Sequence, residues 1–288
     1  MTHILARRPP APRRTLAAPR GALVVLCLAA TFGVACNDDE DDAPLTCDTQ
    51  PLFGQPADNT GLPEGACQPS CQCGGVDFVQ PTYTAETVAS LRARVHLNPP
   101  PLATVDPYDE PEQWVEVPDA VCGALFDDTV TGGYRLETYA DDAAATEAGA
   151  VITHYGACGT CSSFQDLAVY IETPNLTDPV RTCGIRSLTE GDEAAIACIE
   201  EIGFSPACAQ TWFFNTRNTR LECLAVCLTN LNAPNHRPDG SLNPCIQCDE
   251  DLSGPVFKAA AGRTRRNSGI GSALCRPCDD VRPVIHDY

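Results

Sequence analysis

Hydrophobic positions in the first half of the chain recur at helical spacing or alternate with polar ones over short stretches. Val88, Leu91 and Val95 share one face of a predicted helix over residues 84–95, which the prolines at 99–101 must end. Short stretches rich in β-branched and aromatic residues predict strands over residues 114–117, 134–139 and 151–155.

After residue 160 the pattern is mostly helical. It predicts helices over residues 164–171, 192–202, 205–228 and 255–266, with a break near residues 215–218 left open. Ser205-Pro206 marks the start of the third helix, because Ser caps a helix and Pro suits its first turn. The predicted class is α+β, in a single disulfide-rich domain with short strands in the N-terminal part and a cross-linked helical C-terminal part.

The first 35 residues predict an export signal. They hold five arginines and no acidic residue, and end in the apolar run GALVVLCLAATFGVA over residues 21–35. The small residues before Cys36 resemble the lipobox of bacterial lipoproteins, although Gly33 occupies the position usually held by Leu. The resemblance implies a lipid on Cys36 that anchors the protein to the bacterial cell envelope, on its periplasmic or cell-surface side. The alternative is cleavage by ordinary signal peptidase and a plain secreted protein.

Residues 36–66 are rich in Pro, Gly and acidic side chains and predict a tether, followed by a globular domain over residues 67–288. The chain has 19 Lys and Arg against 38 Asp and Glu. Removal of the leader takes away five arginines, which leaves 14 against 38, a net charge of −24. So acidic a protein is not expected to bind nucleic acid.

The cysteine count favours an oxidising compartment. Of the 18 cysteines, 17 follow residue 35, so a lipid on Cys36 leaves 16, enough for eight disulfides.

Two cysteine patterns leave alternatives open. Cys158-Gly-Thr-Cys161, between a predicted strand and a predicted helix, resembles the redox motif of the thioredoxin superfamily, which implies that Cys158 attacks and Cys161 resolves. The alternative is that both are structural and bridge to separate partners. Cys245, Cys248, Cys275 and Cys278 have the spacing of a four-thiolate zinc site, but export favours disulfides, so we predict neither a metal nor a cofactor.

The basic residues near the C-terminus are unusually clustered for such an acidic chain. They predict a pocket for a small anion, formed by Lys258, Arg263, Arg265 and Arg266. The alternative is that the arginines end the helix over residues 255–266 and complement its dipole.

Three further residues are candidates for catalysis: His154 at a strand end, Asp166 on the next helix and His286 near the C-terminus. If the protein is an enzyme, these residues are expected to surround one cleft with Arg263 and Arg266. The chain contains no HExxH, GxSxG, SxxK or P-loop motif. We therefore predict a membrane-tethered binding or structural lipoprotein. An enzyme acting on a small anion and a thiol–disulfide oxidoreductase are the alternatives, and the oligomeric state stays open.

Overall fold

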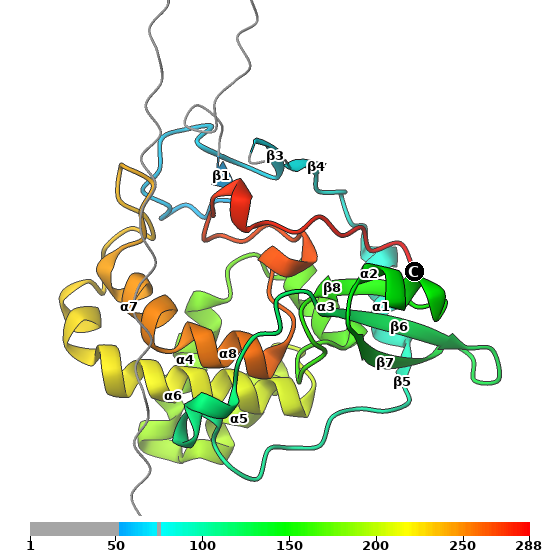
Figure 1. The fold of residues 1–288 in the computed structure, drawn as a ribbon. Coiled ribbons are helices and arrows are strands. Elements are labelled where there is room, and N and C mark those ends of the chain that lie inside the picture. Colours follow the sequence, from blue (N-terminus) through cyan, green and yellow to red (C-terminus); the bar gives the residue numbers. More distant parts are fainter. Residues whose placement is uncertain (1–51, 74–75) are drawn as a thin grey trace, which may run out of the picture. The chain divides into compact units, whose positions relative to one another are not determined.

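A computed structural model describes residues 52–73 and 76–288 (Figure 1). It confirms the α+β class and the disulfide-rich domain. The predicted signal peptide, the lipid-bearing Cys36 and the acidic part of the tether lie outside the described residues.

A four-stranded sheet forms the centre of the N-terminal part. Its strands are β5 (Val95–His96), β6 (Val121–Asp127), β7 (Gly133–Tyr139) and β8 (Val151–Tyr155), in the order β5-β7-β6-β8. Strand β6 is antiparallel to β7 and to β8, with an irregularity between Cys122 and Gly123. Helices α1 (Ala85–Ala93) and α3 (Phe164–Glu172) pack on each other, and α2 (Asp142–Glu147) lies beside β8. The predicted strands over residues 134–139 and 151–155 are confirmed.

The predicted strand over residues 114–117 is wrong. This segment follows a 3₁₀ turn, Pro111–Gln113, and belongs to no strand. Val115 and Val117 are 72% and 53% exposed, so neither packs into a core as the alternating pattern required. Pro118, which has no N–H to donate, closes the segment on its other side.

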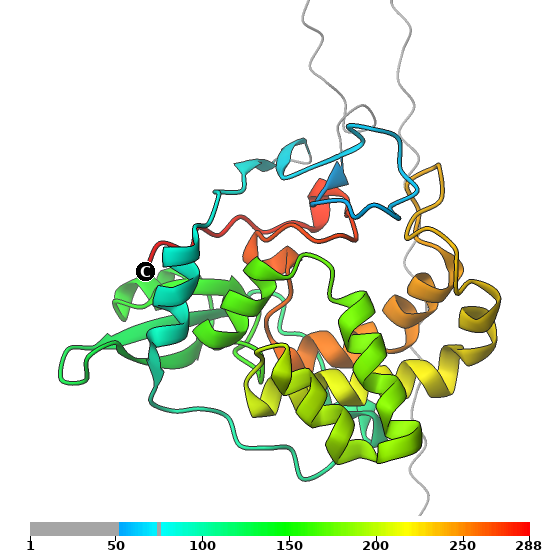
Figure 2. The ribbon, with the colours of Figure 1, turned by 180° about the vertical axis from the view of Figure 1, so that it is seen from behind.

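Helix α6 (Pro206–Thr229) is central to the C-terminal part. It contacts α4 (Thr177–Glu190), α5 (Asp192–Glu201), α7 (Pro244–Leu252) and α8 (Gly254–Ala261). From behind, α4 and α5 lie in front of α6 (Figure 2). Helix α6 continues through residues 215–218, so the break left open there does not occur.

Helix α8 ends earlier than predicted. Gly262 follows it with φ +72°, a conformation that favours glycine, and a Cβ there would lie 2.4 Å from the Gly159 nitrogen. Arg263, Arg265 and Arg266 therefore lie beyond the helix, and the idea that they occupy its last turn is wrong.

Two small paired segments cover the C-terminal residues. Strand β1 (Leu52–Phe53) pairs with β2 (Cys67–Gln68), and β3 (Ser70–Cys73) pairs with β4 (Val76–Val79). Phe53 is 2% exposed and exchanges backbone hydrogen bonds with Arg276. Residues 52–66 therefore belong to the domain, which begins earlier than the predicted boundary at residue 67.

Seven disulfides cross-link the described residues. They are Cys67–Cys275, Cys71–Cys278, Cys122–Cys158, Cys161–Cys208, Cys183–Cys198, Cys223–Cys248 and Cys227–Cys245. An eighth stays a prediction, because Cys47 and the side chain of Cys73 are outside the described part. So many disulfides fit an extracytoplasmic protein in an oxidising compartment. Within residues 52–73 and 76–288, no helix is both long and apolar enough to cross a bilayer.

Candidate functional site

His154 lies at the end of β8 and is fully buried. Its Nδ1 atom is 2.9 Å from the carbonyl oxygen of Tyr155, which can only accept, so Nδ1 carries the proton. Its Nε2 atom therefore accepts from Ser162 Oγ, 2.7 Å away. Burial and the charge of Arg263 hold the pKa of His154 well below its usual value.

Arg263 is also fully buried and lies beside His154. Its guanidinium donates to the carbonyl oxygens of Thr153 and Ser162, at 2.9 and 3.0 Å, and to Ser268 Oγ at 3.2 Å. No ion pair among the described residues includes it. Burial lowers the pKa of Arg263. The guanidinium thus fastens β8 to the loops around it and is not available to a ligand from solvent.

His286 completes this buried cluster. Its Nε2 atom donates to the carbonyl oxygen of Ser268 at 2.8 Å, and its Nδ1 atom accepts from the hydroxyl of Tyr288 at 2.7 Å. Burial and Arg263 lower the pKa of His286 to about 3. The ring of Tyr288 stacks on Phe164 with centroids 4.8 Å apart. The C-terminal segment is therefore held in the core.

Asp166 does not orient His154. It accepts from the backbone nitrogen and hydroxyl of Ser205, at 2.8 and 2.9 Å, and from the hydroxyl of Ser163 at 2.5 Å. Burial raises the pKa of Asp166 to about 6, although these hydrogen bonds oppose the shift. Asp166 thus joins the starts of α3 and α6.

The predicted catalytic residues therefore lie in the core and do not surround a cleft. The structure brings His154, Arg263 and His286 together, but all three are at most 1% exposed. Arg266 lies elsewhere, at an ion-pair cluster described below. A catalytic group must reach its substrate, so these residues form a structural cluster.

The cysteines of the CGTC motif and of the pattern with zinc-site spacing are all held in disulfides with cysteines elsewhere in the chain. Cys158 is bonded to Cys122, and Cys161 to Cys208, so the redox pair implied by the thioredoxin resemblance is wrong. The four cysteines with zinc-site spacing each belong to a different disulfide. Among the described residues, no group of three or more His, Cys, Asp or Glu side chains is arranged to hold a metal ion.

Three cations surround Glu250 on α7. Arg276, Arg266 and Lys258 lie 2.5, 3.1 and 3.5 Å from its carboxylate oxygens. Burial alone would raise the pKa of Glu250, but these three positive charges hold it below its usual value. The basic residues predicted to bind an anion are thus divided between sites, since Lys258 and Arg266 lie here while Arg263 lies in the core.

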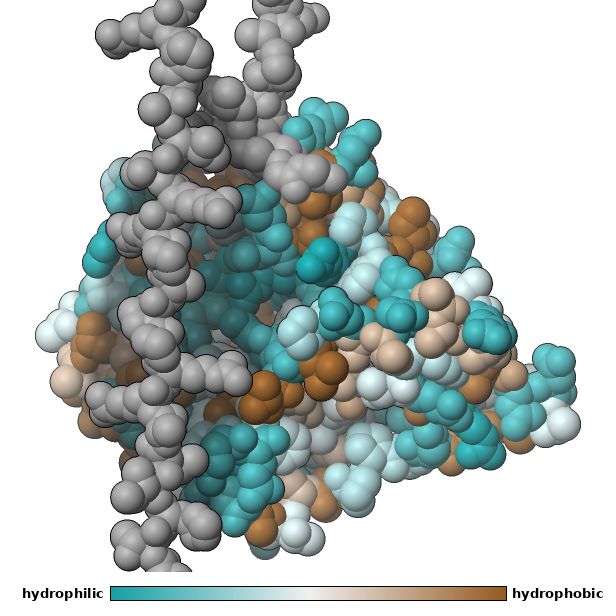
Figure 3. Space-filling view, viewed as in Figure 1, coloured by the Kyte–Doolittle hydropathy of each residue, from teal (hydrophilic) through white to brown (hydrophobic). Residues whose placement is uncertain are grey.

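A cavity of about 710 Å³ opens beside this cluster, between α4, α6, α7 and α8. Figure 3 shows hydrophilic side chains in a hollow between α7, α8 and the C-terminal segment. The inner lining includes Tyr170, Trp212, Phe257 and Arg265. The outer lining is apolar and half exposed, with exposed fractions of 50–64% for Ile185, Leu188, Leu224, Leu228 and Leu231.

The lining of this cavity differs in charge from the rest of the protein. Its six cations are Arg181, Arg220, Lys258, Arg265, Arg266 and Arg276, against three acids, Asp178, Asp249 and Glu250. The chain as a whole carries a net charge of −19. The cavity is therefore a positive region of an acidic molecule, with a field that attracts anions.

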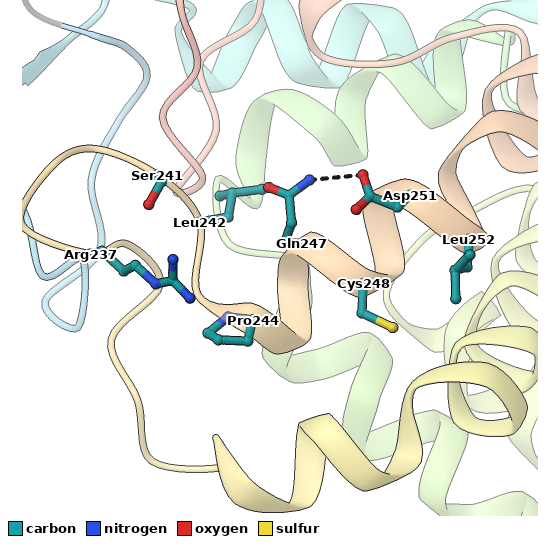
Figure 4. A pocket seen from close by; sticks show the side chains of 8 residues that line it. All are labelled: Arg237, Ser241, Leu242, Pro244, Gln247, Cys248, Asp251 and Leu252. Atoms are coloured by element: carbon teal, nitrogen blue, oxygen red, sulfur yellow. Dashed lines mark hydrogen bonds between the residues drawn. The ribbon is translucent and has the colours of Figure 1, made fainter.

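A second, more open pocket lies on the other side of α7 (Figure 4). It is lined by Arg237, Pro244, Gln247 and Asp251, among others, and Gln247 Nε2 donates to Asp251 Oδ1 at 2.8 Å. Cys248, which also lines it, is bonded to Cys223. This pocket offers one cation and few free polar atoms, so we assign it no function.

The comparisons with known proteins cover the helical part. Residues 192–284 match a family of unknown function (DUF8771). This range contains α6, α7 and α8, which supply three of the four helices around the cavity. No curated protein and no solved structure matches the chain.

Several cavity residues were missed from the sequence, above all Tyr170, Trp212, Glu250 and Arg276. One pattern could have found the cavity. On α6 the lining residues follow one face of the helix, and from Asn215 onward they change from polar to apolar. They are Trp212, Asn215, Thr216, Thr219, Arg220, Leu224, Cys227 and Leu228. Such a stripe is too polar at one end to face a hydrophobic core and too apolar at the other end to face only solvent.

Proposed function

We propose that this protein is an exported lipoprotein that binds a small amphipathic molecule in the cavity between α4, α6, α7 and α8. The gradient of the lining carries the proposal, from aromatic and charged side chains at the inner end to half-exposed Ile and Leu at the outer end. A ligand with a polar head and an apolar chain matches both ends.

The size of the cavity supports a small molecule as its occupant. Cavities that hold small ligands measure roughly 300–1,000 Å³ and are mostly apolar with a few polar groups. At about 710 Å³ this one falls within that range. Exposed apolar side chains clustered around an opening would be costly in water, and an apolar chain would cover them.

The anchoring part of the proposal depends on Cys36, which the lipobox resemblance implicates. Its support in the domain is indirect, since the seven disulfides fit an exported protein. In a bacterial host fed a clickable palmitate analogue, the protein is expected to incorporate the label, and Cys36→Ser to lose it. Label retained in Cys36→Ser, or absent from the wild type, would contradict the anchor.

The cavity is tested with the neutral fluorophore N-phenyl-1-naphthylamine, whose emission rises in apolar surroundings. We expect saturable binding to the purified exported protein, freed of detergent. Leu224→Asp places a carboxylate in the apolar lining, and should weaken binding by about tenfold or more, since covering a Leu side chain is worth about 1.5–3 kcal/mol.

Leu221→Asp is the matched control. Leu221 lies on the same helix and is 70% exposed, but it does not line the cavity, so this variant should bind the fluorophore as the wild type does. If both variants bind equally, the fluorophore occupies another place and the proposal is wrong.

A further inference from the structure

Two polar atoms in the inner lining of the cavity have no well-formed hydrogen bond within the described residues. They are the hydroxyl of Tyr170 and the Nε1 atom of Trp212, both buried. Tyr170 as a whole is only 2% exposed. An indole N–H can only donate, whereas a phenol O–H both donates and accepts. Burial raises the pKa of the Tyr170 hydroxyl, and Trp212 lies close enough to oppose that shift as a weak hydrogen-bond donor, so the Tyr170 O–H above all lacks an acceptor. A buried donor without a partner loses the hydrogen bond that it made to water in the unfolded chain, and a ligand that accepts from it restores that bond.

One positive charge lies beside Tyr170, and a second belongs to the same cavity lining. The guanidinium carbon of Arg265 lies 5.2 Å from the centre of the Tyr170 ring. The N–H groups of Arg265 donate to the backbone carbonyls of Tyr170, Thr173 and Gly271, so it acts on a ligand through its charge. Arg265 occurs in no ion pair among the described residues. Burial lowers the pKa of Arg265 to about 10, which still leaves it protonated at neutral pH. Trp212 packs on Phe257, with ring centroids 4.5 Å apart, and Lys258 is the next residue of α8.

The two acids that α7 contributes to the lining are already satisfied. Glu250 is paired with three cations, and Asp249 accepts hydrogen bonds from Thr219 and from Asn215, the latter at 3.3 Å. Burial raises the pKa of Asp249, while its hydrogen bonds from Thr219 and Asn215 oppose the shift. The inner lining therefore has donors to offer and few free acceptors, which favours an anion over a cation.

We propose that the inner end of the cavity is a carboxylate subsite, and that the ligand is a long-chain carboxylic acid in its ionised form. Its two oxygens accept one hydrogen bond each from Tyr170 and Trp212, and the charges of Arg265 and Lys258 stabilise it. Its alkyl chain follows α6 toward Leu224 and Leu228. This inference rests on the proposed function and specifies the head group.

The test compares two ligands with the same chain, dodecanoate and 1-dodecanol, at pH 8, where the acid is ionised. Each displaces N-phenyl-1-naphthylamine from the purified exported protein. We expect dodecanoate to bind at least tenfold more tightly, because hydrogen bonds to a charged group are about twice as strong as neutral ones. In the double variant Tyr170→Phe, Trp212→Phe, that preference should fall to about twofold or less.

Leu228→Ala is the matched control, since it should weaken both ligands alike and preserve their ratio. Folding is checked by the thermal unfolding of each variant. Tyr170→Phe removes a donor without a partner, so it should not lower the Tm of the ligand-free protein.

The outcomes separate the two proposals. If the alcohol binds as tightly as the acid, or if the preference survives in the double variant, the carboxylate subsite is wrong while the cavity stands. If neither ligand displaces the fluorophore, the cavity does not bind such chains, and both proposals fall.

Discussion

The Nε2 atom of His154 lies 2.7 Å from Ser162 Oγ, and both side chains are completely buried. A serine that donates to a histidine has the hydrogen bond of a catalytic nucleophile and its base. Here the histidine is oriented by the carbonyl of Tyr155, and the serine also accepts from the backbone nitrogen of Gly159 at 2.8 Å. Without access for a substrate, the pair connects β8 to the turn before α3.

Ser162→Ala should therefore act on stability. It leaves the buried His154 Nε2 atom and the partly buried Gly159 N–H without this partner, so we expect the free energy of unfolding in urea to fall by about 1–3 kcal/mol. The exposed Ser90→Ala, on α1, should change it by less than about 0.5 kcal/mol. A fluorophosphonate probe should not label the wild type, and covalent labelling at Ser162 would show that the pair is accessible and reactive.

His286 predicts a loss of stability in acid. Its pKa is about 3 in the folded protein against an ordinary 6.5, so the unfolded chain binds one more proton between these values. The free energy of unfolding should fall as the pH drops through this window, by up to about 1.4 kcal/mol per pH unit. In His286→Asn, the slope of this free energy against pH between pH 4.5 and 6 should be smaller by nearly 1.4 kcal/mol per pH unit, which is the contribution of one proton.

Asp166 should change the free energy of unfolding with pH in the direction opposite to His286. Its pKa is raised from 3.8 to about 6, so the folded protein binds more protons than the unfolded chain between those values. Asp166 then favours the folded state as the pH falls, and Asp166→Asn should make the slope between pH 4.5 and 5.5 steeper. Urea titrations at several pH values measure both slopes, with Ser90→Ala as a control. If both variants shift the slope in the same direction, the opposed pKa shifts are wrong.

Local patterns on the chain predicted much of the fold. The start of α6 at Ser205-Pro206, the strands near residues 134 and 151, and the helix near residue 192 are each fixed by neighbouring residues, so the sequence alone revealed them. The segment over residues 114–117 shows the limit. Its alternation is that of a strand, but a strand also needs a partner, and pairing is set by the rest of the fold.

The site was harder to predict, because its members are distant along the chain. Tyr170, Trp212, Lys258 and Arg276 meet only after four helices pack and the C-terminal segment returns. The sequence did reveal that Lys258, Arg265 and Arg266 are unusual in so acidic a chain, and these three do line the cavity. It could not separate them from Arg263, two residues away, because a turn at Gly262 directs that side chain into the core.

Removal of the central charge from the Glu250 cluster should destabilise the helical part. Glu250→Gln leaves Lys258, Arg266 and Arg276 close together without the carboxylate, so we expect the free energy of unfolding to fall by about 1–3 kcal/mol. Glu222→Gln on α6 is the control, because Glu222 is exposed and occurs in no ion pair among the described residues. Equal stability of the two variants would contradict the cluster's role.

The disulfide pairing around the CGTC motif can be read directly from non-reduced peptides. Proteolysis and mass spectrometry of the alkylated protein should yield the pairs Cys122–Cys158 and Cys161–Cys208. A peptide pair joined through Cys158 and Cys161 would contradict this pairing and restore the redox alternative.

The length of the loop that each disulfide closes predicts how much that disulfide stabilises the fold. Cys161–Cys208 spans 47 residues and Cys183–Cys198 spans 15. A longer closed loop restricts the unfolded chain more, so replacing the first pair by alanine should cost about 1 kcal/mol more than replacing the second, on a basis of about 2–4 kcal/mol for either. Because Cys161 and Cys208 are both fully buried, lost packing adds to the difference. Urea unfolding of the two double variants measures it, and a larger loss from the shorter loop would show that chain entropy and packing do not set these contributions.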